Sequence, residues 1–158
     1  MNDLFSSAAR WIWLCDPRRD KNVYACFRRR FSLPHAPSDN ASLRITADSR
    51  YELYLNGHWV GHGPVRAFPS AWPVDIYNVS HLLRRGDNVL AVLVHRFGLS
   101  TFQYLDNPPG LLAQLEFSDA TPRLVSDGSW RSIEHEGYAF PVPRISVQQG
   151  WEEQFDAR

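Results

Sequence analysis

Apolar and polar side chains alternate along several short stretches of this chain, which is the period of a β-strand. Residues 51–55 alternate in this way, and Asn56-Gly57 follows directly. This dipeptide favours a type I′ turn because both of its residues tolerate positive φ. The pattern predicts a β-hairpin whose second strand begins near His58.

The same signals mark further strands, separated by turn residues. They are expected at residues 11–14, 23–33, 41–47, 74–79, 89–94 and 111–117, with shorter ones at 123–125, 130–133 and 145–147. Residues 89–94 are the most apolar of these, which predicts the centre of a sheet. One helical turn is expected from Ser80, as its N-cap, to Gly86 after its end. Many short strands with almost no helix predict an all-β fold, an antiparallel two-sheet β-sandwich of the jelly-roll type.

The segment from Gly61 to Pro73 contains two Gly and three Pro. This composition argues against a regular element, so we expect an ordered loop. Loops of this length without structure of their own are often functional.

A length of 158 residues suits one domain with a sizeable core. We expect a flexible N terminus over residues 1–10 and a single sandwich over residues 11–158. The 17 basic and 17 acidic residues balance, so net charge does not favour nucleic acid or an anionic membrane as a partner. Arg28, Arg29 and Arg30 form a local basic run, which is expected to decorate one face of a sheet.

Cys15 and Cys26 have neither the spacing of a metal site nor the number that a disulfide framework needs. Two reduced thiols are favoured, and a pair bridged across adjacent strands is the alternative. The N-terminal residues lack the charged start and apolar run of a secretory signal, and no segment is long and apolar enough to span a membrane. The expected location is therefore cytoplasmic.

The sequence offers no pair of acids that predicts catalysis. Glycosidase chemistry needs two carboxyl groups roughly 5–10 Å apart across a bound sugar. The acids here are scattered at Asp48, Glu52, Asp75, Glu116, Glu152 and Glu153. Asp75 lies in an apolar stretch, where it is expected to pair with an arginine such as Arg66 or to cap a turn. The alternative is a buried acid with a raised pKa.

No metal site or cofactor is predicted. His58 and His62 are separated by four positions but flank a turn and a Gly-rich segment, so their spacing does not supply ligand geometry. A structural calcium ion is compatible with a β-sandwich, but no sequence signal places its ligands.

Recognition is the remaining chemistry that the residue types favour. Sugars bind where an aromatic ring stacks on the apolar face of a pyranose and polar groups hold its hydroxyls. The candidate carbohydrate-binding residues are Trp59, Trp72, Arg66, His58 and His62. Nearby groups that could supply further contacts are Asp48, Phe102, Gln103 and Tyr104. In the alternative reading, Trp59 and Trp72 pack beneath the long loop as a satellite core.

A resemblance to a known family is carried by four segments. They are Tyr51-Glu-Leu-Tyr-Leu-Asn-Gly57, Val79-Ser-His-Leu-Leu-Arg-Arg-Gly-Asp-Asn-Val-Leu-Ala-Val92, Ser126-Asp-Gly-Ser-Trp130 and Glu153-Gln-Phe-Asp-Ala-Arg158. Together they resemble the N-terminal β-sandwich of bacterial α-L-rhamnosidases. The last resembles the family segment Gly-Glu-x-Tyr-Asp-Ala-Arg, with Glu152 in place of Gly and Phe155 in place of Tyr. The others are also similar to sugar-binding domains of β-galactosidases and β-glucuronidases.

The resemblance implies a galactose-binding-like jelly roll that precedes an (α/α) barrel, which hydrolyses terminal rhamnose by inversion. Because that barrel carries the catalytic carboxylates, the resemblance transfers no catalytic residue to this chain. The expected function is a non-catalytic accessory domain, with the barrel and carbohydrate as partners. An independent lectin-like module and a purely structural docking domain stay open. For the latter, the docking patch is expected near Trp151 and Phe155.

Overall fold

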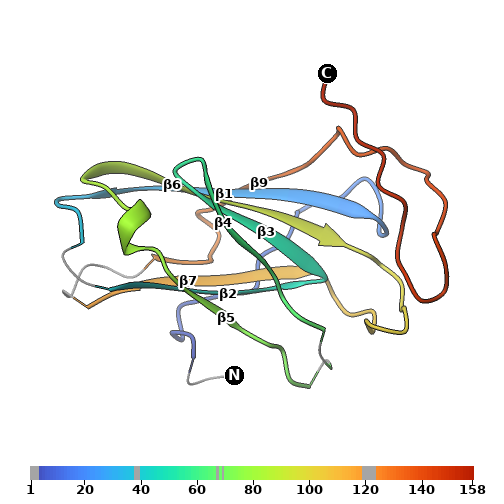
Figure 1. Ribbon diagram of the computed structural model, residues 1–158, viewed down its shortest axis with the longest axis horizontal. Helices are drawn as coiled ribbons and strands as arrows, with labels where there is room; N and C mark the ends of the chain where they lie inside the picture. The colour runs from blue at the N-terminus through green and yellow to red at the C-terminus, as the bar shows by residue number, and fades with distance from the viewer. Residues whose placement is uncertain (1–3, 38–39, 67, 69, 119–123) are drawn as a thin grey trace.

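Two antiparallel sheets lie face to face in the computed structural model (Figure 1), which describes residues 4–37, 40–66, 68, 70–118 and 124–158. Within these residues, the five-stranded sheet has the order β4-β3-β6-β1-β9 and the four-stranded sheet the order β5-β2-β7-β8. This arrangement confirms the predicted all-β sandwich. No helix in the described ranges is long and apolar enough to cross a membrane.

The elements follow the chain with repeated crossings between the two sheets. They are β1 (Val23–Leu33), β2 (Ala41–Asp48), β3 (Arg50–Leu55), β4 (His58–Gly63), β5 (Asp75–Asn78), the 3₁₀ turn η1 (Ser80–Leu82), β6 (Gly86–Arg96), β7 (Gly110–Phe117), β8 (Leu124–Val125) and β9 (Arg131–Glu134). The loop from β6 to β7 and the segment after β9 meet at one end of the sandwich, on the right in Figure 1.

The core lies between the sheets and follows the alternation of the sequence. Leu53 on β3 pairs with Val92 on β6, and both are buried against the other sheet. β6 is the middle strand of its sheet, as its apolar run predicted. Burial of each large side chain contributes about 1.5–3 kcal/mol, and a slip of one residue would turn a whole row to solvent.

The predicted hairpin turn is confirmed, and it is tied to a second corner of the chain. Asn56 and Gly57 have φ values of 53° and 84°. The side chain of Asn56 donates to Asn88 Oδ1 at 2.8 Å and accepts from the Val89 N–H at 2.9 Å. The two asparagines therefore hold the β3–β4 hairpin against the start of β6.

Two of the predicted strands do not form. Over residues 11–14 only Ile12 pairs, in a single bridge to Leu111, and residues 145–147 form no strand. The helical turn exists, but its N-cap is Val79 and not Ser80, whose N–H donates to Asn78 Oδ1 at 3.1 Å. Arg123, at the start of another predicted strand, lies outside the described residues.

The loop predicted from Gly61 begins later, because residues 61–63 belong to β4. A Cβ on Gly61 would lie 2.7 Å from the ring of Tyr77, and one on Gly63 would collide with Asp75. The glycines therefore serve close packing of strand β4 and do not break it, which is why composition alone misplaced the boundary. Residues 67 and 69 of this loop lie outside the described part of the chain.

Candidate functional site

Of the five predicted carbohydrate-binding residues, the structure brings Trp59 and His62 into contact. His58, Trp59 and His62 lie on β4, at the edge of the five-stranded sheet, and all three are exposed. The Trp59 side chain is 58% exposed, and its ring centroid lies 6.0 Å from that of His62. Trp59 therefore does not belong to a satellite core.

Trp72 and Arg66 have different surroundings. Trp72 is half-buried and packs on Trp11 with 5.8 Å between ring centroids, so the satellite-core reading describes this tryptophan. Arg66 is exposed and forms no hydrogen bond or ion pair with any described residue. In the described part of the chain, no ring contact, hydrogen bond or ion pair joins either residue to His58, Trp59 or His62.

The prediction that Asp75 pairs with Arg66 is wrong. Its carboxylate accepts a hydrogen bond of 2.5 Å from the Tyr51 hydroxyl, which also lies 3.1 Å from the hydroxyl of Tyr77. Burial raises the pKa of Tyr51, so this hydroxyl stays a donor. The absence of side chains at Gly61 and Gly63 makes the room that these groups occupy.

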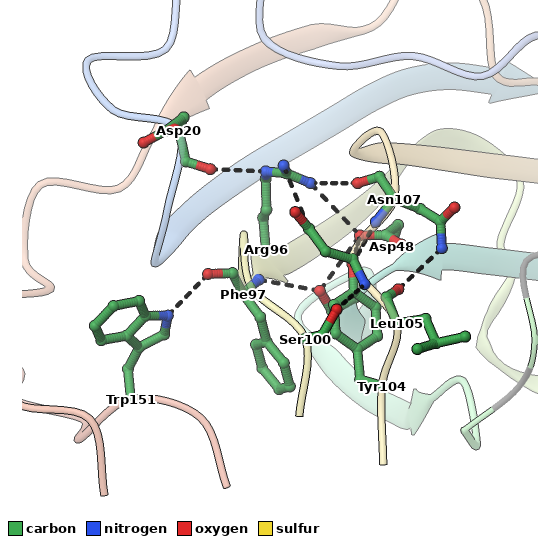
Figure 2. Close-up of polar contacts among 11 residues, drawn as sticks. Asp20, Asp48, Arg96, Phe97, Ser100, Tyr104, Leu105, Asn107 and Trp151 are labelled. Atoms are coloured by element: carbon green, nitrogen blue, oxygen red, sulfur yellow. Dashed lines mark hydrogen bonds and ion pairs between the residues drawn. The ribbon is translucent and has the colours of Figure 1, made fainter. Parts of the chain in front are cut away.

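A buried ionic network lies beneath the loop from β6 to β7 (Figure 2). Arg96, at the end of β6, is its centre. The Nε of Arg96 donates to the Asp20 carbonyl at 2.9 Å and Nη1 donates to the Asn107 carbonyl at 2.6 Å. Its ion pairs are with Asp48, 3.8 Å from Nη1, and with Asp106, 3.5 Å from Nη2.

Asp48 is fully buried at the end of β2. Its Oδ1 accepts a hydrogen bond of 2.5 Å from the Tyr104 hydroxyl, whereas its Oδ2 has no hydrogen-bond partner among the described residues. Burial raises the pKa of Asp48 to about 6, although the Tyr104 hydrogen bond and the Arg96 charge oppose the rise. The carboxyl therefore titrates near neutrality, and its partners make it part of a structural network.

Two further hydrogen bonds join this loop to the segment after β9. The indole of Trp151 donates to the Phe97 carbonyl at 2.8 Å (Figure 2). Arg144 Nη2 donates to the carbonyls of Ser100 at 2.9 Å and of Val147 at 3.0 Å. The two segments are thereby fixed to each other at one end of the sandwich.

Exposed apolar side chains gather on these two joined segments. Phe102 is 74% exposed and Val147 55% exposed. We call the four exposed apolar side chains on these segments the rim patch. They are Phe102, Leu105, Ile145 and Val147. The patch predicted near Trp151 and Phe155 lies in the same C-terminal region, where Trp151 is half-buried and Phe155 is exposed.

One end of the outer face of the five-stranded sheet carries a stack of aromatic rings. There Tyr24 stacks between His95 and Tyr138, with centroid distances of 3.9 and 3.5 Å. Burial lowers the pKa of His95 to about 3, so its ring is neutral. Beyond this stack lies an open groove of about 600 Å³, the outer-face groove. Its main lining residues are Cys26, Arg28, Tyr54, Leu93, Arg131 and Ile133.

The remaining candidates are structural or unassigned. Trp130 is buried and its indole donates to the Val125 carbonyl at 2.8 Å, so the Asp-Gly-Ser-Trp motif closes a turn against the core. Cys15 is exposed and Cys26 is half-buried, and both are free thiols. Over the described ranges, no three His, Cys, Asp or Glu side chains are placed to hold a metal ion.

The sequence model of the α-L-rhamnosidase N-terminal domain family matches residues 37–139. This chain belongs to that family. A GH78 family rhamnosidase of Bacillus sp. GL1 is 42% identical to this rhamnosidase N-terminal domain, with a TM-score of 0.88, over 95% of this chain and 16% of that one.

Two curated proteins extend the comparison. An α-L-rhamnosidase of Streptomyces avermitilis is 29% identical over 80% of this chain and 12% of its own length. A β-galactosidase of Aeromonas hydrophila is 35% identical over 59% of this chain and 9% of its own length. The rhamnosidase N-terminal domain thus spans only a small part of the proteins that it matches.

Three features of this N-terminal domain were not found from the sequence. The sequence patterns do not single out Arg96, and they mark Asp48 only as a scattered acid or a sugar contact and Tyr104 only as a sugar contact. The stack around Tyr24 and the groove beside it were also missed. The alternation over residues 23–33 places Cys26 and Arg28 on one face, which was the available signal for the groove.

Proposed function

We propose that this chain is a non-catalytic accessory domain of an enzyme that hydrolyses terminal α-L-rhamnosides, and that it packs against the catalytic barrel through the rim patch. The observation that carries the docking role is the exposure of four apolar side chains on two segments that Arg144 and Trp151 hold together. Contiguous exposed apolar surface is typical of interaction sites.

The rigidity of the rim patch supports this role. Its loop is fixed from below by Arg96 and from the side by Arg144, through hydrogen bonds to carbonyls of the loop. A surface that is already ordered loses little conformational freedom on association, so more of the apolar contact stabilises the complex.

The catalytic part of the proposal is tested with p-nitrophenyl α-L-rhamnoside. We expect the purified 158-residue chain to release nitrophenol at the rate of buffer alone, and the full-length enzyme to release it rapidly. Release by the isolated chain above that background would contradict the proposal, because it would require a catalytic site within the sandwich.

The docking part is tested in the full-length enzyme with Phe102→Ser. We expect this change to make the junction between the domains more sensitive to limited proteolysis. The matched control is Ile76→Ser, because Ile76 is 58% exposed but lies on β5, the edge strand of the four-stranded sheet, outside the rim patch. Equal sensitivity of the two variants would argue against docking through the rim patch.

A second candidate function, carbohydrate recognition, is favoured by the 58% exposure of Trp59 beside His62 on β4. Titration with neutral rhamnose-bearing oligosaccharides would then change the tryptophan fluorescence of the isolated chain. The change should disappear in Trp59→Ala and persist in Trp72→Ala, because Trp72 packs on Trp11. An unaltered response in Trp59→Ala would exclude the β4 surface as the site.

A further inference from the structure

Two exposed arginines face each other on the outer face of the five-stranded sheet. Arg28 of β1 is the cross-strand partner of Arg131 of β9, and both side chains line the outer-face groove. Among the residues that the structure describes, neither guanidinium forms an ion pair or a hydrogen bond. Like charges directly opposite each other destabilise a sheet, and a bound anion would remove that repulsion.

The register explains why there is a hollow between these strands. Tyr54, Ala91, Arg28 and Arg131 form one cross-strand row over β3, β6, β1 and β9. Ala91 is small, so the groove opens between Tyr54 on one side and the strand β9 side chains on the other. The volume of about 600 Å³ lies within the range of small-molecule sites.

The same row continues into an aromatic surface. Tyr54 pairs with the exposed Trp59 on β4, and its hydroxyl donates to Glu52 Oε2 at 2.6 Å, which fixes the orientation of the ring. At 4.7–4.9 Å per strand, the row of five strands spans roughly 19 Å. The outer face thus carries the rings of Trp59 and Tyr54 at one side and the guanidinium groups of Arg28 and Arg131 at the other.

We propose that the outer-face groove binds an acidic oligosaccharide, with the carboxylate of a uronic acid residue between Arg28 and Arg131 and a pyranose ring against Tyr54. A guanidinium binds a carboxylate through two parallel hydrogen bonds, and an aromatic ring offers a surface for the apolar face of a sugar. The inference deepens the carbohydrate-recognition function proposed above and does not depend on docking through the rim patch.

An acidic peptide fits this groove less well than a sugar. Peptides add to the edges of sheets, where backbone groups find hydrogen-bond partners. Ala91, Leu93 and Cys26, in the middle of the groove, offer no such partners to the N–H and C=O groups of a peptide. A pyranose can place its C–H groups on this surface and keep its hydroxyls in water.

The test is calorimetric titration of the purified chain with trigalacturonate at low ionic strength, beside the neutral galactose trimer. We expect the acidic trimer to bind and the neutral trimer to bind at least about tenfold more weakly, because hydrogen bonds between charged groups are strong. Arg28→Gln should weaken binding of trigalacturonate by about tenfold. The matched control is Arg30→Gln, because Arg30 is exposed on β1 but does not line the groove.

Three results would overturn the inference. One is equal affinity for the acidic and the neutral trimer, which would exclude an acidic site. If Trp59→Ala then abolishes the binding of both trimers, the carbohydrate-recognition function proposed above is still supported. Another is an equal loss in Arg30→Gln and Arg28→Gln, which would indicate general attraction to positive charge. The third is binding of polyglutamate without binding of either trimer, which would identify a peptide site.

Cys26 gives an independent readout of where the ligand lies. Its thiol is half-buried in the groove, and burial raises its pKa, so it reacts slowly with maleimides. In Cys15→Ser, which leaves Cys26 as the single cysteine, bound trigalacturonate should slow this reaction further. Arg28→Gln should remove that protection. An unchanged rate at saturating trimer would place the binding site elsewhere and overturn the inference.

Discussion

Arg96 and Arg28 lie on neighbouring strands of one sheet and have opposite surroundings. Arg96 has oxygen partners on four residues, which are Asp20, Asp48, Asp106 and Asn107. Arg28 has no such partner among the described residues and faces Arg131. The difference separates an arginine that holds the fold together from one that is available to a ligand.

Burial accounts for this division. The Arg96 side chain is only 13% exposed, so its charge must be compensated by protein groups or the fold loses stability. Water solvates Arg28, and its side chain keeps rotamer freedom until a ligand orders it. An exposed arginine therefore costs the fold little and can bind an anion, whereas Arg96 cannot leave its partners.

The largest effect is expected from Arg96→Ala. The change leaves the buried Asp48 without its cation and frees the loop that begins at Phe97, so we expect a loss of about 3–5 kcal/mol in the free energy of unfolding. Denaturant unfolding, monitored by tryptophan fluorescence, measures this loss. Arg30→Ala, at an exposed position with no partner among the described residues, should change the value by less than about 0.5 kcal/mol.

A similar, small loss in both variants would contradict the comparison. It would mean that Asp48 is neutral across the accessible pH range and needs no cation. The stability of Arg96→Ala would then equal that of an ordinary surface substitution.

A smaller effect, specific to pH, is expected from Asp48→Asn. Burial raises the pKa of Asp48 from 3.8 to about 6 in the folded protein. The fold therefore favours the protonated form, and this contribution to stability falls as pH rises from about 4 through 6. At about 1.4 kcal/mol for each pKa unit, the loss is about 3 kcal/mol. Asparagine cannot ionise, so it removes this dependence.

The measurement is the difference in unfolding free energy between Asp48→Asn and the unmodified protein at pH 4 and at pH 7.5. Taking the difference cancels the contribution of other titrating groups. We expect the unfolding free energy of Asp48→Asn, relative to that of the unmodified protein, to be up to about 3 kcal/mol higher at pH 7.5 than at pH 4. A difference independent of pH would show that the fold does not raise the pKa of Asp48.

Local pattern was sufficient for the strands and the hairpin. The strand expected over residues 23–33 is β1 as observed, because alternation and the following Pro34 are both local signals. The Asn56-Gly57 turn was found for the same reason. Each depends on neighbours within a few residues, so single-sequence reasoning can reach it.

Side-chain partners that depend on the pairing of strands far apart in the sequence could not be found in this way. Asp48 ends β2 and Arg96 ends β6, and they meet because β3, which begins at Arg50, pairs with β6, with the Ser49 N–H donating to the His95 carbonyl at 3.2 Å. The two tryptophans show the same limit. Trp72 is half-buried because Trp11, from a distant segment, packs on it, whereas Trp59 lies exposed on the edge strand β4.

The smallest effect is expected from Arg131→Gln. Without a ligand, this change removes the repulsion between Arg131 and Arg28, so the free energy of unfolding should rise by up to about 0.5 kcal/mol at low salt. The gain should vanish in 1 M salt, where the screening length is about 3 Å. A loss above about 1 kcal/mol would instead show that Arg131 makes a contact that the fold needs. A small gain together with weaker binding of trigalacturonate would mean that the fold tolerates the arginine pair at some cost to its own stability, as a site for an anion requires.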